Sequence, residues 1–314
     1  MKISHLSFGA SSLGSVFHET KLDESIRAVE VAIEGGINFI DVSPYYGHYK
    51  AETVLGQALK GIPREKYYLS TKVGRYGQDG KNTWDYSAER VTRSVYESME
   101  RLGIDFIDLI NVHDIEFQAA LPGGLQKVVD ETLPALFELK HKGVVGHVGI
   151  TDLQLENLKW VVEHVEIRNE ELGMGNDGVE SILNFCHYTL NDDALADYVG
   201  FFEHHNVGVI NASPLSMGLL SQRGVPAWHP APKPLVKACE KAAAYCKEKG
   251  YPIEKLAVQY SVSFPRIAST LFSSANPENV KRNIEWANEE PDWELVNAVK
   301  EIIGNQQRVT WENT

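Results

Sequence analysis

Four side chains in the first half of the chain are suited to proton transfer. They are a carboxylate, a phenol, an ammonium and an imidazole, at Asp41, Tyr46, Lys72 and His113. A phenol is a poor base near neutral pH because its ordinary pKa is roughly 10, but a nearby ammonium favours the phenolate and lowers that pKa. If the fold brings these groups together, Lys72 can activate Tyr46 as a base. Asp41 would keep Lys72 in place and charged, and His113 would orient the reacting oxygen.

Each of these charged or aromatic residues lies at or just beyond the end of a predicted strand. Apolar patterns predict strands over residues 37–40, 67–72 and 106–111, which lead into Asp41, Lys72 and His113. In a parallel barrel the carboxyl ends of all strands open on one face, where barrel enzymes carry their active sites. The structural alternative is an ordinary ion pair at the strand ends with a stacked tyrosine and histidine.

The remainder of the 314 residues continues the alternation of strands and helices. The other predicted strands cover residues 6–9, 144–150, 179–184, 208–212 and 267–272. The predicted helices lie around residues 26–33 and over 51–59, 88–102, 127–142, 155–164, 192–204, 235–249, 253–264, 277–288 and 292–303. Long loops are expected over residues 74–86, 114–126 and 214–234. Eight strand–helix units without a linker predict an α/β fold, a (β/α)8 TIM barrel that forms one domain over residues 1–314.

Composition restricts the classes of partner. The formal net charge is −13, and no basic cluster predicts a nucleic-acid-binding face. No apolar run approaches the eighteen residues of a membrane span, and no signal peptide is evident, so we expect a cytoplasmic enzyme with a small-molecule partner. The cysteines at positions 186, 239 and 246 lack metal-ligand spacing, and we predict no metal site. The oligomeric state stays open.

One short motif invites a different interpretation. Residues 173–178 match the pattern G-x-G-x-x-G. A dinucleotide-binding fingerprint must follow a strand and open a helix. Here the pattern follows a charged helical segment and leads into a predicted strand, so we interpret it as a turn.

The four residues also carry a family resemblance. The Asp-x4-Tyr, Thr-Lys and Val-His patterns resemble the catalytic tetrad of the aldo-keto reductases, which implies catalytic roles for Asp41, Tyr46, Lys72 and His113. The resemblance extends over nearly the whole chain. Longer strings look like the branch of that family that contains the L-galactose and L-fucose (aldose) dehydrogenases; these lie at residues 74–76, 85–90, 113–117, 186–188 and 228–230.

The resemblance implies a nicotinamide dinucleotide that lies extended across the barrel mouth. Its pyrophosphate is expected along residues after the seventh strand, namely Ser213, Pro214, Leu215, Met217, Gly218 and Leu219. Its adenosine end is expected near the helix at 277–288, where the helix N-terminus also suits phosphate, at Ser274, Asn279 and Asn283. Thr151 and Asn184 remain as hydrogen-bonding groups for the nicotinamide amide.

The cofactor is expected to be NAD, with NADP less favoured. NADP-dependent members place a lysine and an arginine around the 2′-phosphate, and the matching positions here hold Ser273 and Asn279. A dianionic phosphate would lack its charge-assisted partners there. Lys281 and Arg282 are close in sequence and could partly substitute.

The loops after strands three, four and seven carry candidate substrate contacts. A sugar offers an apolar C–H face and a rim of hydroxyls, which suit aromatic and polar side chains. The candidates are Trp84, Tyr86, Asp114, Phe117, Trp228 and His229. The alternative is that Trp84 and Trp228 only pack their own loops.

The resemblance implies the NAD-dependent oxidation of an aldose at C1 to the aldonolactone, with L-galactose expected first and L-fucose and D-arabinose as related substrates. One alternative is a broad-specificity NAD(P)H aldehyde reductase. Another is a barrel retained as a binding or channel-associated subunit.

Overall fold

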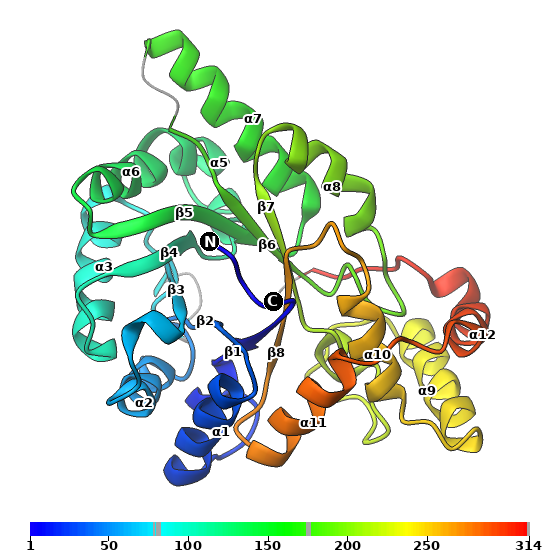
Figure 1. Cartoon of the computed structure of the whole chain (residues 1–314). Coiled ribbons are helices and arrows are strands. Elements are labelled where there is room, and N and C mark those ends of the chain that lie inside the picture. Colours follow the sequence, from blue (N-terminus) through cyan, green and yellow to red (C-terminus); the bar gives the residue numbers. More distant parts are fainter. Residues whose placement is uncertain (78, 80–82, 174–176, 313–314) are drawn as a thin grey trace.

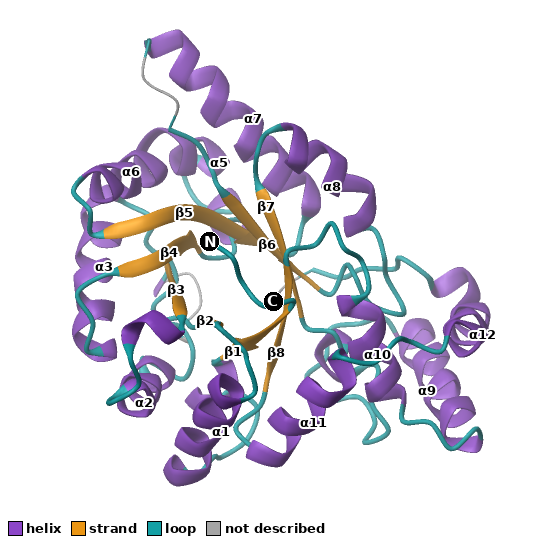
Figure 2. Cartoon of the chain, viewed as in Figure 1, coloured by secondary structure: helices purple, strands orange, loops and turns teal. Residues whose placement is uncertain are grey.

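The computed structural model describes residues 1–77, 79, 83–173 and 177–312. Within these residues, eight parallel strands form a closed barrel in which each strand pairs with its neighbours in sequence and β8 closes on β1. The helices form an outer layer around the strands (Figures 1 and 2). The (β/α)8 barrel predicted from the alternating pattern is therefore confirmed.

The strands agree with the predicted ones to within two residues at their ends. They are β1 Leu6–Gly9, β2 Phe39–Asp41, β3 Tyr68–Val73, β4 Ile107–Val112, β5 Val145–Asp152, β6 Ser181–Phe185, β7 Gly208–Ala212 and β8 Ser269–Ser273. The main helices are α1 Leu22–Glu34, α2 Lys50–Leu59, α3 Ala88–Leu102, α6 Leu133–His141, α7 Leu155–Leu172, α8 Leu195–His204, α9 Lys233–Glu248, α10 Ile253–Val262, α11 Pro277–Ala287 and α12 Trp293–Ile303.

Two sequence-based predictions about the secondary structure between β4 and β6 were wrong. The segment expected as a long loop contains two short helices, α4 Glu116–Ala119 and α5 Gly124–Lys127. The helix predicted to end at residue 164 continues to Leu172, because Val165 and Asn169 extend its buried face before Gly173 ends it in a left-handed conformation. Residues 174–176 of the G-x-G-x-x-G pattern lie outside the described residues.

The interior of the barrel is apolar at the level of the strand centres. Side chains from five strands pack together there, namely Phe39, Leu109, Leu183, Ile210 and Leu271. Successive residues of a strand point to opposite faces, so the residues two positions along also point inward. Asp41 follows Phe39 in this way, and Asn111 and His113 follow Leu109. The same apolar layer that fills the barrel therefore fixes the direction of the polar residues above it.

Helix α3 shows how the outer layer holds these strands. Its N-cap Ser87 accepts a hydrogen bond from the Arg90 backbone N–H, and Gly103 ends the helix with φ of 69°. Val91 and Val95 are fully buried along the face that packs toward the barrel. The helix connects β3 to β4, whose register aligns Lys72 with Asn111.

Candidate active site

The structure brings the four predicted catalytic side chains together at the carboxyl ends of β2, β3 and β4. The Lys72 ammonium donates hydrogen bonds to the Asp41 carboxylate, to the Val42 carbonyl at 3.0 Å and to the Tyr46 hydroxyl at 3.3 Å. The Tyr46 and His113 rings meet edge to face with centroids 5.7 Å apart. The Tyr46 hydroxyl therefore bonds to one ammonium, and the Tyr46 ring lies beside one imidazole.

A close backbone approach positions the tyrosine. Gly14 lies in the loop after β1, and a Cβ on this residue would be only 2.7 Å from the Tyr46 carbonyl oxygen. Gly47 follows the tyrosine with φ of 62°, a conformation that glycine adopts readily. These two glycines allow the loops after β1 and β2 to pack directly on each other.

The Lys72–Asp41 ion pair is almost completely buried, with side-chain exposures of 2% and 4%. The Ser70 hydroxyl donates to the other Asp41 oxygen at 2.9 Å, and the register places Ser70 directly beside Asp41. Burial disfavours the charge on Lys72, but the neighbouring Asp41 and Tyr46 oxygens outweigh it and raise the pKa of Lys72 above its ordinary value. Lys72 is therefore protonated at neutral pH.

Tyr46 differs from the sequence-based expectation. Burial raises the pKa of Tyr46 above its ordinary value, Lys72 offsets only part of this rise, and the Asp41 and Asp114 carboxylates add to it. Lys72 does act to lower the pKa of Tyr46, as predicted, but burial outweighs it, and residue spacing carried no information on burial. At neutral pH the free site therefore holds Tyr46 as a neutral phenol.

His113 is neutral, and Ser43 selects its tautomer. Ser43 Oγ lies 3.0 Å from His113 Nδ1 and already accepts the Tyr45 backbone N–H at 3.1 Å. With the Ser43 hydroxyl assigned as the donor, Nδ1 is the acceptor and the proton is on Nε2. Burial lowers the pKa of His113 well below its ordinary value although Asp114 opposes this, and Arg75 and Lys72 lower it further. His113 can thus donate a hydrogen bond from Nε2 to a reacting oxygen.

Ser43 was missed at the sequence level. Its signal was present, since it is a small hydroxyl residue two positions after Asp41 in the same loop. The predicted cluster brought this loop near His113, but no pattern in the chain showed that Ser43, 70 residues away in sequence, would be its hydrogen-bond partner.

Asp114 and Thr151 form a second polar pair beside His113. The Thr151 hydroxyl donates to the Asp114 carboxylate at 2.9 Å and accepts the Asp114 backbone N–H at 2.8 Å. Burial opposes the charge on Asp114, but the neighbouring His113 and Arg75 and the Thr151 hydrogen bond outweigh it, so the pKa of Asp114 lies below its ordinary value. Thr151, predicted to contact the nicotinamide amide, is therefore already engaged with Asp114 in this structure.

A cavity of about 1410 Å³ opens above these groups. Single small ligands generally occupy about 300–1000 Å³, so this cavity has room for a dinucleotide together with a small substrate. Sixteen of the residues predicted for the site line it: Asp41, Tyr46, Lys72, His113, Asp114, Phe117, Thr151, Ser213, Pro214, Leu215, Met217, Gly218, Trp228, Ser274, Asn279 and Asn283.

Two predicted cofactor contacts lie elsewhere. Asn184 is fully buried, and its amide nitrogen donates to the Asp152 and Leu153 carbonyls at 2.9 Å each, so it joins β6 to the end of β5. Leu219 is buried in the apolar core between the barrel and the helices. Neither side chain faces the large cavity, because Asn184 is bonded to the end of β5 and Leu219 packs in the core, so contact of these two residues with the cofactor is still a prediction.

Three predicted substrate contacts also do not line the cavity. The Tyr86 hydroxyl donates to the His113 and Asp114 carbonyls and so supports the loop after β4 from beneath. Trp84 packs on Phe117 of α4, with ring centroids 4.2 Å apart, so it joins the loop after β3 to the loop after β4 and does more than pack its own loop. His229 lies 3.0 Å from the Ser216 carbonyl and accepts the Ala231 backbone N–H, which fixes its own loop.

The loop after β7 is suited to an extended phosphate-bearing ligand. Ser213, Ser216 and Met217 have φ of 60°, 49° and 56°, and Gly218 has φ of 107°. A Cβ on Gly218 would lie 2.9 Å from Pro226. Ser213, Met217 and Gly218 of this tight turn line the same cavity as the catalytic groups and as Asn279 and Asn283 of α11.

The expectation for the N-terminus of α11 needs a correction. The Asn276 side chain caps this helix by accepting the backbone N–H groups of Glu278 and Asn279 at 2.9 and 3.1 Å. Those donors are therefore already used and are not presented to a phosphate. Arg282 lines the same end of the cavity, with its guanidinium 5.8 Å from the centre of the Trp286 ring.

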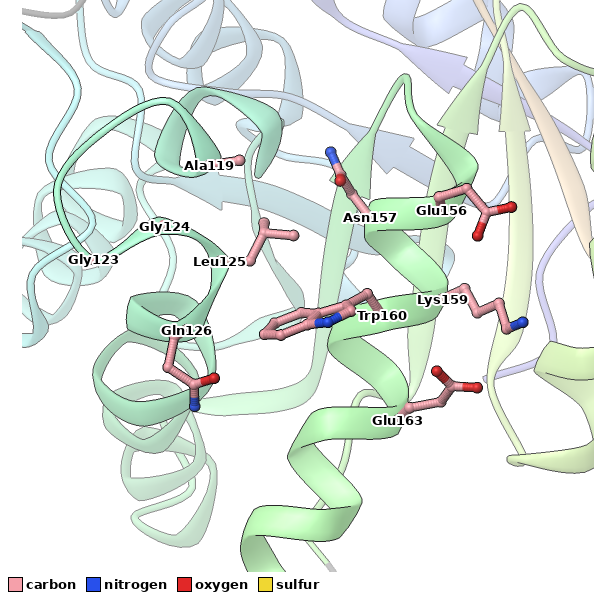
Figure 3. Close-up of a pocket in the computed structure, with 10 residues that line it drawn as sticks. All are labelled: Ala119, Gly123, Gly124, Leu125, Gln126, Glu156, Asn157, Lys159, Trp160 and Glu163. Carbon is pink, nitrogen blue, oxygen red and sulfur yellow. The ribbon is translucent and has the colours of Figure 1, made fainter.

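A smaller cavity of about 560 Å³ lies between α5 and α7, where Trp160 projects toward Leu125 (Figure 3). It shares no lining residue with the large cavity. Among the described residues, no cluster of three metal-ligating side chains is present and no helix is long and apolar enough to cross a membrane.

Comparisons with known proteins match the whole barrel. The model of the Aldo/keto reductase family matches residues 5–303. L-Galactose dehydrogenase of Arabidopsis thaliana is 41% identical over 99% of this chain and 94% of its own length. D-Arabinose 1-dehydrogenase of Saccharomyces cerevisiae is 32% identical over 83% of this chain and 76% of its own. A solved aldo-keto reductase from Bacillus halodurans, in its holo form, superposes with a TM-score of 0.72 at 26% identity over 99% of this chain and 95% of the other.

Proposed function

This chain belongs to the aldo/keto reductase family, and on that basis we propose that it oxidises an aldose at C1 to the aldonolactone with NAD. Members of the family are oxidoreductases that use a nicotinamide cofactor, and the nicotinamide supplies the hydride-accepting carbon. The large cavity offers room for such a dinucleotide beside a sugar. The proposal concerns the substrate, the choice of dinucleotide and the roles of individual residues.

The contacts of Tyr46 with Lys72 and His113 carry the proposal. Oxidation removes a hydride from C1 and a proton from the C1 hydroxyl. The proton passes to Tyr46, whose ionised form is stabilised by Lys72 at 3.3 Å. His113 donates from Nε2 to the same substrate oxygen and orients C1. Asp41 keeps Lys72 charged, and Ser43 holds the His113 tautomer.

The wall of the cavity supports NAD over NADP. Ser273 carries no charge, and its hydroxyl is bonded to the Ser12 backbone N–H at 2.9 Å and to the Ser11 side chain at 3.0 Å. Asn279 is neutral as well. Arg282 also lines the cavity, and one guanidinium offers a weaker site for a dianionic phosphate than a lysine–arginine pair.

The named relatives support a substrate in the L-galactose series. One relative is named for L-galactose and another for D-arabinose. These two sugars and L-fucose share their configuration at C2 to C4 and differ at C6. We therefore expect a site that selects the configuration at C2 to C4, accepts different substituents at C6 and does not bind D-galactose productively.

Steady-state rates with purified protein test this proposal. We expect formation of reduced nicotinamide from L-galactose, L-fucose and D-arabinose, with a higher kcat/KM for NAD than for NADP and little turnover of D-galactose. Equal rates on D- and L-galactose, or a preference for NADPH and simple aldehydes, would assign the protein to the broad aldehyde reductases. A protein that binds nicotinamide without turnover would fit the binding-subunit alternative.

A further inference from the structure

A buried arginine lies in the wall of the cavity and has no role in the proton-transfer scheme. Arg75 follows β3 and is only 7% exposed, yet it lines the cavity. Its guanidinium is held between the Tyr45 and Phe117 rings, 3.9 and 4.0 Å from their centroids. A backbone bridge to Trp84 holds the residue from behind. The orientation of the guanidinium plane is therefore fixed before any ligand binds.

The hydrogen bonds of Arg75 are incomplete. Nη1 donates to the Asp114 carboxylate, and Nε is buried without a partner. Within the described residues, Nη2 makes no hydrogen bond either, but unlike Nε it is not enclosed. A guanidinium carries five N–H donors in one plane, and buried donors in native proteins are normally paired. Arg75 thus presents unused donors at the cavity wall.

Arg75 is close to the reacting atoms. Its partner Asp114 has a carboxylate oxygen 3.6 Å from His113 Nε2, the group that donates to the reacting oxygen. Tyr45, which stacks on the guanidinium, has its ring 5.8 Å from the His113 ring. A substrate oxygen bound by His113 therefore brings the neighbouring carbon of the substrate toward Arg75 and Asp114.

We propose that Arg75, aligned by Asp114, binds the hydroxyl on the carbon next to the reacting one and thereby reads the C2 configuration of the sugar. Arg75 donates a hydrogen bond to the hydroxyl oxygen, and Asp114, which already accepts from Thr151 and Arg75, accepts a hydrogen bond from the same hydroxyl group. The inference rests on the proposed aldose oxidation and identifies a specificity-determining pair for it. Arg75 takes no part in proton or hydride transfer.

The test compares L-galactose with 2-deoxy-L-galactose on the wild type and on Arg75→Met. A hydrogen bond to a charged group stabilises a complex enough to change kcat/KM roughly 10- to 100-fold. We expect the wild type to prefer L-galactose by about this factor. We expect Arg75→Met to lose activity on L-galactose and to retain it on the 2-deoxy sugar, so that the preference disappears. Arg75→Lys keeps the charge but loses the planar fork, and should recover only part of the preference.

A matched control separates substrate recognition from structural support. Arg64 also pairs with an aspartate, Asp108, and lies 4.9 Å from the centre of the Tyr67 ring, but it does not line the cavity. Arg64→Met should lower stability and leave the ratio of the two sugars unchanged. If Arg75→Met lowers kcat/KM equally for both sugars, as a purely structural residue would, the inference is overturned while aldose oxidation stands. If the wild type oxidises neither sugar with NAD, both the proposed function and the inference fall.

Discussion

Replacing Lys72 by methionine removes the cation from the centre of the site while keeping much of its volume. In the native protein, Lys72 Nζ contacts the Asp41 carboxylate, the Val42 carbonyl and the Tyr46 hydroxyl. The variant leaves Asp41 buried with the Ser70 hydrogen bond as its remaining side-chain partner among the described residues. The two side chains are 2% and 4% exposed, so solvent cannot compensate the lost charge.

The expected cost follows from this burial. Removing one member of a buried ion pair typically destabilises a protein by about 3–5 kcal/mol, because the other charge stays unpaired. Burial already raises the pKa of Asp41 above its ordinary value, and Lys72 is the largest opposing influence, so the variant carries a carboxyl with a still higher pKa. The folded variant then binds this proton more tightly than the unfolded chain does. Its stability is fully recovered below the unfolded-state pKa of roughly 3.9 and is lost as pH rises through the folded-state pKa.

Urea unfolding measured across pH tests this expectation. The double variant Lys72→Met/Asp41→Asn should regain much of the lost stability at neutral pH, because no unpaired buried charge remains, and should stay inactive. Lys142→Met is the matched control, since Lys142 pairs with Glu138 on the surface at exposures of 57% and 66%, and we expect no resolvable change in unfolding free energy. A Lys72→Met protein as stable as the wild type at pH 7, or one that loses stability on mild acidification, would refute a buried Lys72–Asp41 ion pair.

The remaining predictions concern catalysis and cofactor choice. Tyr46→Phe should lower kcat roughly 10²–10⁴-fold, while fluorescence titration shows unchanged dinucleotide binding; turnover within about twofold of the wild type would exclude Tyr46 as the acid–base group. Because burial raises the pKa of Tyr46, oxidation should speed up and carbonyl reduction slow down as pH rises, and a pH–rate profile with the opposite slope would contradict this. Ser43→Ala removes one buried hydrogen bond, about 1 kcal/mol, from the Nε2–H tautomer of His113 and should lower kcat several-fold; ¹⁵N NMR of the imidazole checks the tautomer directly. Asn279→Arg combined with Ser273→Lys should shift the kcat/KM ratio toward NADP, and a wild type that already prefers NADP would show that these positions do not decide the choice.

The barrel fold and the catalytic cluster could both be predicted from the sequence, and for the same physical reason. Strand periodicity places every second residue inward, so Asp41, Lys72 and His113 could be assigned to the carboxyl ends of parallel strands and hence to one face. Strand ends were correct to within two residues because short apolar runs and the breaks between them determine them. The long loops were less predictable, and the two helices within residues 116–127 were missed.

Most side-chain positions that the sequence did not predict depend on contacts with distant segments of the chain. Thr151 bonds to Asp114, 37 residues away, and Asn184 bonds to carbonyls at the end of the preceding strand. Tyr86 supports the loop after β4 instead of facing a ligand. The same limit hid Arg75, whose orientation depends on aromatic rings from two other loops.

The fate of the hydrogen at C1 of L-galactose tests the central claim most directly. Purified protein would be incubated with NAD and L-galactose deuterated at C1, and both products would be analysed by mass spectrometry. We predict one deuterium in the reduced nicotinamide, a lactone without deuterium at C1, and formation of both products that is slower by roughly 10²–10⁴-fold in Tyr46→Phe. Absence of deuterium from the nicotinamide, or equal transfer from the corresponding D-galactose, would contradict oxidation of an L-galactose-type sugar at this site.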